Sequence, residues 1–585
     1  MGRRSATVIS RCGRLLEPPR QEQAGPVPDT PLVDVPIGAR SDAWVTVAPQ
    51  RRVLLVAHNL TTVTRLLDVI CVFDSDPRVQ VVASWSGSDP FHRDLDQVFT
   101  DLGVVTVPWV QALHTRFDLA IAASHHGGLA DLNSPLVILS HGIGYTKNSP
   151  GNRKPETGNR KPETGNRKPE TGNRQTFGLS PQWLLDDGRP IADALVLSHP
   201  EQLDRLRAAV PEVAHTAVIA GDPCFDRIRA SLGLRRRYRR LIAGDERRKI
   251  VVVSSTWSAG STFGRRPDLL RHLMSELPLD YQVVGIVHPN TWAGHGPWQI
   301  RTWLADCLRA GLVLVPPAEG WRAALIAADC LIGDIGATTA YGSAIDVPTL
   351  LAAFPEDNVA AGSPVAVLGD IAARLDPRES LRTQIDRAIA LHRPGAYDRV
   401  TELVTSVPDE SPKLLRALFY RLMNVSEPDG EAPLWRIPTA GLPGSRPVVS
   451  ALEVQVELGR SSGSAVVTQF PAELRSRHTD LTVGHIVCHI DHPGRRLLAS
   501  ADVLYVLAHE LAETAEEWIT ETLRVHQGCG LAAVVDADSA LVGSRDGRVW
   551  RVSAADPVRQ VSVLRAWLVA GERPEAADGA ITLVS

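Results

Sequence analysis

Residues 334–348 place an acid, small residues and hydroxyls in an order that suits anion binding. The apolar run 331–333 ends at an acid, and the residues with candidate roles are Asp334, Gly336, Thr338, Thr339 and Asp346. This pattern predicts a buried strand, then a helix opened by small and hydroxyl residues. Free N–H groups at a helix N-terminus attract anions, so the stretch is predicted to hold a group such as a diphosphate. The plain alternative is a capped strand–turn–helix unit.

Four other apolar runs also end in side chains that could do chemistry. They are followed by His141, Gly142 and Lys147, by Gly221 and Asp226, by Thr256, and by His288. An imidazole titrates near neutrality, so His141 is predicted to be a general base that takes a proton from a hydroxyl. His288 is predicted to donate to phosphate oxygens, and Lys147 to neutralise phosphate charge. His58 and the pair His125–His126 are weaker candidates.

These residues need a scaffold that brings strand ends together. Short apolar strands alternate with helical stretches from residue 51, and the alternation restarts at residue 249. Such a pattern predicts an α/β protein with two Rossmann-like domains, over residues 49–230 and 245–395. Ligands of open parallel sheets bind beyond the carboxyl ends of the strands, so a cleft between the two domains is expected.

The remaining segments differ in texture. Residues 1–48 are rich in Pro, Arg and Gly and are predicted to be a disordered tail. The heptad that begins at Gly151 repeats through 151–174 without an apolar position, which predicts a solvated loop, with a lid as the alternative. Residues 396–445 are predicted to form a helix and a linker, and 446–585 a smaller α/β domain of unknown role.

Composition restricts the partners. The net charge of −4 argues against a nucleic-acid partner. Seven scattered cysteines without a Cys-x-x-Cys pair predict reduced thiols and a cytoplasmic location, and neither a signal peptide nor a spanning helix is expected. The basic run 234–240 is predicted to be a solvated helix face. Peripheral contact with the inner face of the membrane is left open as an alternative.

Two segments contain residue types that bind metals, but neither has a recognised spacing. Residues 488–492 include Cys488, His489, Asp491 and His492 without a partner pair further along, and His509-Glu510 lacks a second histidine four residues later. No metal is therefore predicted, and no cofactor.

The strand-end signals occur in an order that resembles the CDP-glycerol glycerophosphotransferase family, the teichoic-acid polymerases and primases. The resemblance covers about residues 52–395. The matching motifs are His141-Gly142 with Lys147, Gly221 with Pro223 and Asp226, Thr256-Trp257, His288-Pro289, and Asp334 with Asp346 and Pro348. It implies a GT-B-like arrangement of the two Rossmann-like domains. It also implies transfer of a glycerol-phosphate (polyol-phosphate) group from a CDP-activated donor to a hydroxyl of a cell-wall polymer or lipid-linked acceptor.

The chain also departs from the pattern of that family. Gly336-Ala337 stand where the family has two serines, Tyr341 where it has an acid, and Ser258 where it has an arginine. Two alternatives therefore stay open: a relative of nucleotide-sugar glycosyltransferases or epimerases, and a non-catalytic scaffold on a decayed transferase fold. The predicted substrate-binding set is Gly142, Lys147, Gly221, Asp226, Thr256, Asp334, Gly336, Thr338, Thr339 and Asp346.

Overall fold

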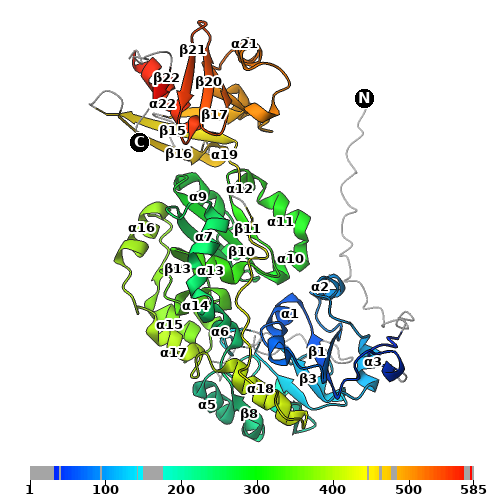
Figure 1. The fold of residues 1–585 in the computed structure, drawn as a ribbon. Coiled ribbons are helices and arrows are strands. Elements are labelled where there is room, and N and C mark those ends of the chain that lie inside the picture. Colours follow the sequence, from blue (N-terminus) through cyan, green and yellow to red (C-terminus); the bar gives the residue numbers. More distant parts are fainter. Residues whose placement is uncertain are drawn as a thin grey trace, which may run out of the picture. The chain divides into compact units, whose positions relative to one another are not determined.

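A computed structural model shows the arrangement of the elements (Figure 1). It describes residues 32–38, 41–92, 95–140, 142–148, 175–444, 447–459, 464–475, 484–571 and 580–582. The chain divides into two units, residues 1–48 and 49–585. The first contains, in its described part, a short 3₁₀ helix, η1 (Ser41–Ala43). Most of the predicted tail and the whole predicted repeat loop lie outside the described residues.

The first sheet has six parallel strands in the order β2-β1-β3-β4-β7-β8. Their bounds are β1 (Arg51–Ala57), β2 (Val79–Trp85), β3 (Leu119–Ala122), β4 (Leu136–Ile138), β7 (Ala194–Leu197) and β8 (Ala217–Ile219). Residues 53–57 are buried, as expected for a parallel sheet with both faces covered. The apolar run 104–107, whose composition alone would predict a strand, makes a single bridge to β2 through Thr106 before Pro108 leads into α3 (Trp109–His114).

The second sheet repeats this architecture with six parallel strands in the order β11-β10-β9-β12-β13-β14. Their bounds are β9 (Lys249–Ser255), β10 (Tyr281–Val287), β11 (Val313–Val315), β12 (Cys330–Gly333), β13 (Thr349–Leu351) and β14 (Ala373–Arg374). Both halves are Rossmann-like, which confirms the predicted α/β fold class.

The segment 396–445, predicted to be one helix and a linker, contains two helices in its described part. They are α17 (Asp398–Val404) and α18 (Ser411–Leu422). The second helix packs on the first domain, because Phe419 lies in the same core cluster as β1 and its ring centroid is 5.8 Å from that of Phe73. Thus α18 completes the hydrophobic core of the domain that begins the chain.

The last domain has an eight-stranded sheet in the order β16-β15-β17-β18-β19-β20-β21-β22. The strands are β15 (Ala451–Leu458), β16 (Ala465–Pro471), β17 (His485–His489), β18 (Val503–Leu507), β19 (Leu531–Val535), β20 (Ser539–Ser544), β21 (Val549–Ser553) and β22 (Ala580–Thr582). The central three, β17, β18 and β19, are parallel. Adjacent Val503 and Leu504 lie in different core clusters, one with α22 (Pro557–Ala570) and one with α21 (Ala515–Val525). Helices therefore cover both faces of the sheet.

This last domain is joined to the second domain through a shared core. Leu474 of the short helix α19 (Ala472–Arg475) has no exposed surface and belongs to the cluster that contains Leu273 and Cys307. The Leu279 N–H donates to the Gln469 carbonyl at 2.8 Å. The two domains therefore share apolar contacts as well as backbone hydrogen bonds.

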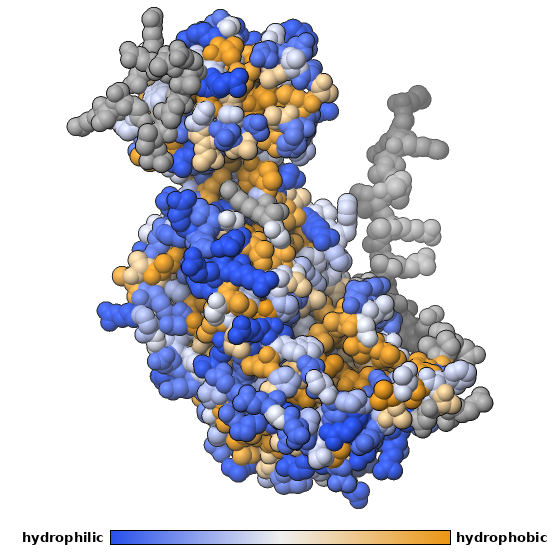
Figure 2. All heavy atoms as spheres, viewed as in Figure 1, coloured by the Kyte–Doolittle hydropathy of each residue, from blue (hydrophilic) through white to orange (hydrophobic). Residues whose placement is uncertain are grey.

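Hydrophilic residues gather over the basic helix α7 (Arg235–Ala243), as Figure 2 shows. Arg235 and Arg239 pair with Asp329 at 2.8 and 2.7 Å, and two further arginines pair with Glu246. These pairings favour the interpretation of the run as a helix face. Among the described residues, no helix has the length and apolar character needed to cross a membrane.

Candidate functional site

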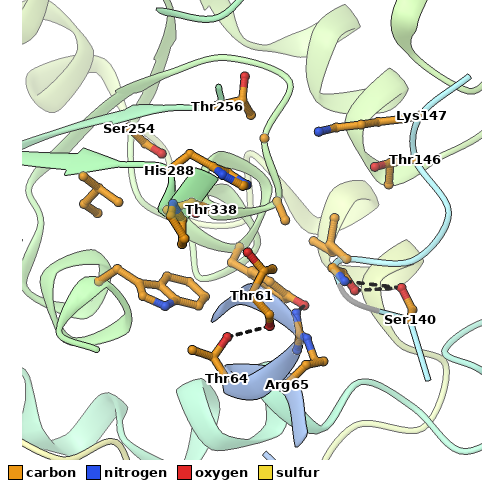
Figure 3. A pocket seen from close by; sticks show the side chains of 18 of the residues that line it. Thr61, Thr64, Arg65, Ser140, Thr146, Lys147, Ser254, Thr256, His288 and Thr338 are labelled. Carbon is orange, nitrogen blue, oxygen red and sulfur yellow. Dashed lines mark hydrogen bonds between the residues drawn. The ribbon is translucent and has the colours of Figure 1, made fainter. Parts of the chain in front are cut away.

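A cavity of about 170 Å³ lies between the first two sheets, beyond the carboxyl ends of their strands (Figure 3). The first domain contributes Thr61, Thr64 and Arg65 of α1 (Leu60–Leu66) and, after β4, Ser140 and residues 142–147. The second contributes the ends of β9 and β10 and the start of α14 (Ala337–Ala344). This is the edge at which parallel α/β sheets bind ligands.

Six of the predicted site residues are brought together in this cavity. The lining includes Gly142, Lys147, Thr256, His288, Gly336 and Thr338. His125, a weaker candidate, also lines it. His141, the predicted general base, lies outside the described residues, whereas its neighbours Ser140 and Gly142 both face the cavity.

Asp334 and Thr339 are not in the lining, although Gly336 and Thr338, which are two positions and one position away, are. The Asp334 carboxylate is buried and accepts hydrogen bonds from the backbone N–H and the hydroxyl of Thr256, each at 2.9 Å. It also accepts from Gly336 N–H at 3.0 Å, while its own N–H donates to the Thr339 hydroxyl at 3.2 Å. The structure therefore places the acid as the residue that positions Thr256 and the start of α14.

Gly336 is required by the close approach of these segments. A Cβ atom at this position would lie 2.8 Å from the Cγ2 of Thr256, closer than such atoms approach in proteins. A serine here would have to displace Thr256. The glycine thus lets the strand end of β9 lie against the helix start.

Three further predicted residues join segments outside the lining. The Asp226 carboxylate is buried and accepts N–H groups of Asp409 and Ser411 at 2.9 and 3.0 Å, together with the Ser411 hydroxyl. Gly221 has φ +78°, and a Cβ there would meet the same hydroxyl at 2.6 Å. Asp346 accepts the Gly395 N–H at 3.0 Å. None of these three residues lines the cavity. The two carboxylates bind backbone N–H groups elsewhere, and the glycine permits a close approach to Ser411.

Lys147 carries its charge into the cavity. Its backbone forms a bridge to Val359 of the second domain, which fixes the segment between the two domains. Among the described residues, no carboxylate lies within ion-pair distance of its ammonium group. Burial lowers the pKa of Lys147, and the charge of Asp334 opposes this shift. An anion bound beside Lys147 would stabilise its protonated form.

His288 begins α10 (Pro289–His295), and its Nδ1 accepts the Asn290 N–H at 3.0 Å. A neutral imidazole that accepts at Nδ1 carries its proton on Nε2. The local backbone therefore selects the tautomer that can donate from Nε2. This geometry is suited to a hydrogen-bond donor for a phosphate oxygen.

The floor of the cavity holds residues that the sequence interpretation missed. Arg65 donates to the Tyr341 hydroxyl at 2.8 Å, and that hydroxyl donates to Asp222 at 2.6 Å. Arg65 and Tyr341 both line the cavity, as does Arg322 of α13 (Trp321–Ala327). These residues come from helices of both domains, so a local sequence pattern could not bring them together.

A single carboxylate organises this floor. Asp68 is fully buried and pairs with Arg227 at 2.5 Å, Arg322 at 2.9 Å and Arg65 at 3.3 Å. Burial alone would raise the pKa of Asp68, but the three guanidinium groups outweigh it and lower the pKa. The sequence did contain a signal for this cluster. Charged residues lie inside the apolar stretch 61–73, and a charge buried there requires a partner.

The lining therefore has one sign of charge. Arg65, Lys147 and Arg322 line the cavity together with His288, and no aspartate or glutamate is present among the described lining residues. The two arginines are held by carboxylates behind the wall, whereas no carboxylate in the described part of the chain lies within ion-pair distance of Lys147. Such a wall attracts an anionic ligand.

Comparisons with known proteins give similarities of architecture. No protein-family model matches the chain, and no curated protein is significantly similar to it in sequence. The solved structures that resemble it include the wall teichoic acid polymerase TagF, at 10% identity, TM-score 0.41, 64% of this chain and 90% of that one. The UDP-GlcNAc 2-epimerase from Methanocaldococcus jannaschii is 10% identical, with TM-score 0.38 over 63% of this chain and 99% of that one. A complex of S. aureus MnaA with UDP is also 10% identical, with TM-score 0.37 over 65% and 99% of the two chains. Likenesses of this size say nothing about substrate or reaction.

Proposed function

We propose that this chain transfers a polyol-phosphate group, such as glycerol phosphate, from a CDP-activated donor to a hydroxyl of a cell-wall polymer or lipid-linked acceptor. The observation that carries the proposal is the cavity wall, which combines Arg65, Lys147 and Arg322 with hydroxyl groups and has no described carboxylate. A nucleoside diphosphate derivative is an anion of the kind that such a wall would bind. The order of motifs in the sequence supports the CDP-activated class.

The reaction is a phosphoryl transfer. The acceptor oxygen forms a bond to the phosphorus of the glycerol-phosphate group, the bond from that phosphorus to the bridging oxygen breaks, and CMP leaves with the electron pair. The acceptor hydroxyl gives its proton to a base. Alignment and charge stabilisation supply most of the catalysis in such reactions.

The residues divide between these tasks. In this proposal Thr256, Thr338 and the start of α14 hold the diphosphate oxygens, and His288 donates to them from Nε2. Lys147 offsets the charge that develops as CMP leaves. His141 is the proposed base, because Ser140 and Gly142 on either side of it line the cavity.

Donor binding and turnover test this proposal. The full chain is mixed with CDP-glycerol, CDP-ribitol or UDP-GlcNAc, and unfolding temperature, affinity and released nucleotide are measured. CDP-glycerol at 100 times its Kd should add about 2.7 kcal/mol to the free energy of unfolding. Release of CMP should require an acceptor with a free hydroxyl.

A pair of lysine variants provides the internal control. Lys147→Met should weaken CDP-glycerol binding by roughly 10-fold or more, the usual effect of losing a hydrogen bond to a charged group. Lys413→Met removes an exposed lysine that pairs with Glu410 at 3.0 Å and should leave affinity unchanged. Turnover of a UDP-sugar without CMP release would favour the nucleotide-sugar alternative. Binding of no nucleotide at all would favour the scaffold.

A further inference from the structure

The third domain has a cluster of metal-ligating side chains on its sheet. His489 is the last residue of β17, Asp491 follows it by two positions, and Glu510 lies just beyond β18. These two strands are parallel neighbours, paired from Val487 with Val503 to His489 with Tyr505. Their carboxyl ends lie at one edge, where parallel sheets bind ligands.

The three side chains converge. One ligand atom from each lies within 4.8 Å of the other two. His489 Nε2 and Glu510 Oε2 are 2.9 Å apart, a separation close to that of two donors on one ion. The partly buried imidazole has its ring centroid 5.0 Å from that of Tyr505, and Glu510 also accepts the Leu507 N–H at 3.1 Å. The imidazole and one carboxylate are therefore oriented by their surroundings.

We propose that His489, Asp491 and Glu510 bind a divalent transition-metal ion, with Zn²⁺ and Mn²⁺ as the best-matched ions. One neutral imidazole and two carboxylates balance a charge of +2. Imidazole is a common ligand for transition ions, whereas Mg²⁺ and Ca²⁺ prefer all-oxygen sites. Asp491 and Glu510 are exposed, so water or an anionic ligand would complete the coordination.

Metal binding requires a proton shift within the histidine. His489 Nδ1 accepts the Asp491 N–H at 3.2 Å, so Nε2 carries the proton and donates to Glu510. An ion at Nε2 replaces that proton, which moves to Nδ1. The weak contact from the Asp491 N–H to Nδ1 is then lost, because both nitrogens carry a proton.

The two sequence segments complete each other in this site. Residues 488–492 offer His489 and Asp491 but lack a further partner along the chain, and Glu510 belongs to a segment without a second histidine. Folding brings β17 and β18 together, so each segment supplies what the other lacks. A search by spacing within one segment cannot detect such a set.

The experiment uses the full chain with Zn²⁺, Mn²⁺ or Mg²⁺ as the probe. Titration calorimetry should give one equivalent of Zn²⁺, and the electron paramagnetic resonance signal of free Mn²⁺ should decrease by one equivalent. His489→Ala, Asp491→Asn and Glu510→Gln should each weaken binding by more than the roughly 10- to 100-fold caused by loss of an outer-shell partner. His509→Ala removes an exposed neighbouring imidazole and should change nothing.

Three results would overturn the proposal. They are absence of one-equivalent binding at millimolar metal, affinity unchanged in the Asp491→Asn and Glu510→Gln variants, or Mg²⁺ binding as tight as Zn²⁺. If His489→Ala fails to fold, the two variants at exposed positions decide. None of these readouts depends on nucleotide turnover, so they are independent of the proposed transferase reaction.

Discussion

The hydroxyl of Tyr341 donates to the Asp222 carboxylate at 2.6 Å, which ties a helix of the second domain to the start of α6 (Pro223–Ala230). The same hydroxyl accepts from Arg65 of the first domain at 2.8 Å. Tyr341 has no exposed surface. One buried hydroxyl thus joins two charged groups that also pair directly with each other at 3.4 Å.

Tyr341→Phe should lower the free energy of unfolding by about 1–3 kcal/mol, because it removes two buried hydrogen bonds to charged groups, one from Arg65 and one to Asp222. Chemical denaturation of both proteins measures this loss. Tyr145→Phe is the matched control, since the buried Tyr145 hydroxyl has no hydrogen-bond partner in the described part of the chain. Equal losses in the two variants would contradict a role for the Tyr341 hydrogen bonds.

Asp226→Asn should destabilise the protein without weakening the donor site. The carboxylate accepts from Asp409 N–H and from Ser411 at the start of α18, so its loss should cost about 1.5–3 kcal/mol. Affinity for CDP-glycerol, measured below the unfolding transition, should be that of the unchanged protein. A tenfold loss of affinity at unchanged stability would instead support the prediction from the sequence that Asp226 contacts the substrate.

Affinity for the donor should fall as the pH is raised, and this fall should begin at a lower pH than it would with an ordinary lysine. Burial lowers the pKa of Lys147, and only the protonated ammonium attracts a diphosphate. Affinity should therefore fall as the pH rises through this lowered pKa, below the usual value of about 10.4. The Lys147→Arg variant keeps its positive charge at alkaline pH, so its affinity for the donor should persist to a higher pH. Parallel pH profiles for the two proteins would show that Lys147 does not face the donor.

Two buried histidines should make the fold sensitive to acid. Burial lowers the pKa of His58 and of His485 to about 4. Unfolded histidine binds a proton near pH 6.5, so stability should fall as the pH decreases from about 6.5 to 4, by up to about 3 kcal/mol for each residue. Unfolding measured across this range should show a weaker pH dependence in His58→Gln and His485→Gln. An unchanged slope would mean that these rings are protonated in the folded protein.

Much of the fold could be predicted because its central strands are apolar runs with distinct ends. The strands β1, β9 and β10 are examples, since parallel strands buried on both faces need no polar position. The run at 104–107 was misleading, because only tertiary pairing decides whether an apolar segment extends beside β2. The strand β15 was missed, although its alternation of apolar and polar residues over 451–458 carries a period of two.

The candidate site was predictable only at the strand ends. Thr256 and His288 reach the cavity together because the carboxyl ends of the parallel strands β9 and β10 share an edge, and Lys147 reaches it from the segment after β4 in the other sheet. Asp334 also follows such a strand, yet it binds backbone N–H groups behind the wall. The sequence does not reveal whether an acid at a strand end faces the cavity or the backbone behind it. The partners Arg65 and Tyr341 are 276 positions apart, so only the fold relates them.

Leu474 of the third domain completes part of the hydrophobic core of the second domain. A chain shortened to end at residue 445 would lack this side chain and would expose apolar residues around Leu273 to water, which should cost about 1.5–3 kcal/mol for each large side chain uncovered. Lower solubility and an earlier thermal transition should follow, whereas an unaltered transition would mean that the contact contributes nothing. The domain that carries His489 is thus a poor candidate for exchange between genes as a separate module, because the second domain would be left with an incomplete interior.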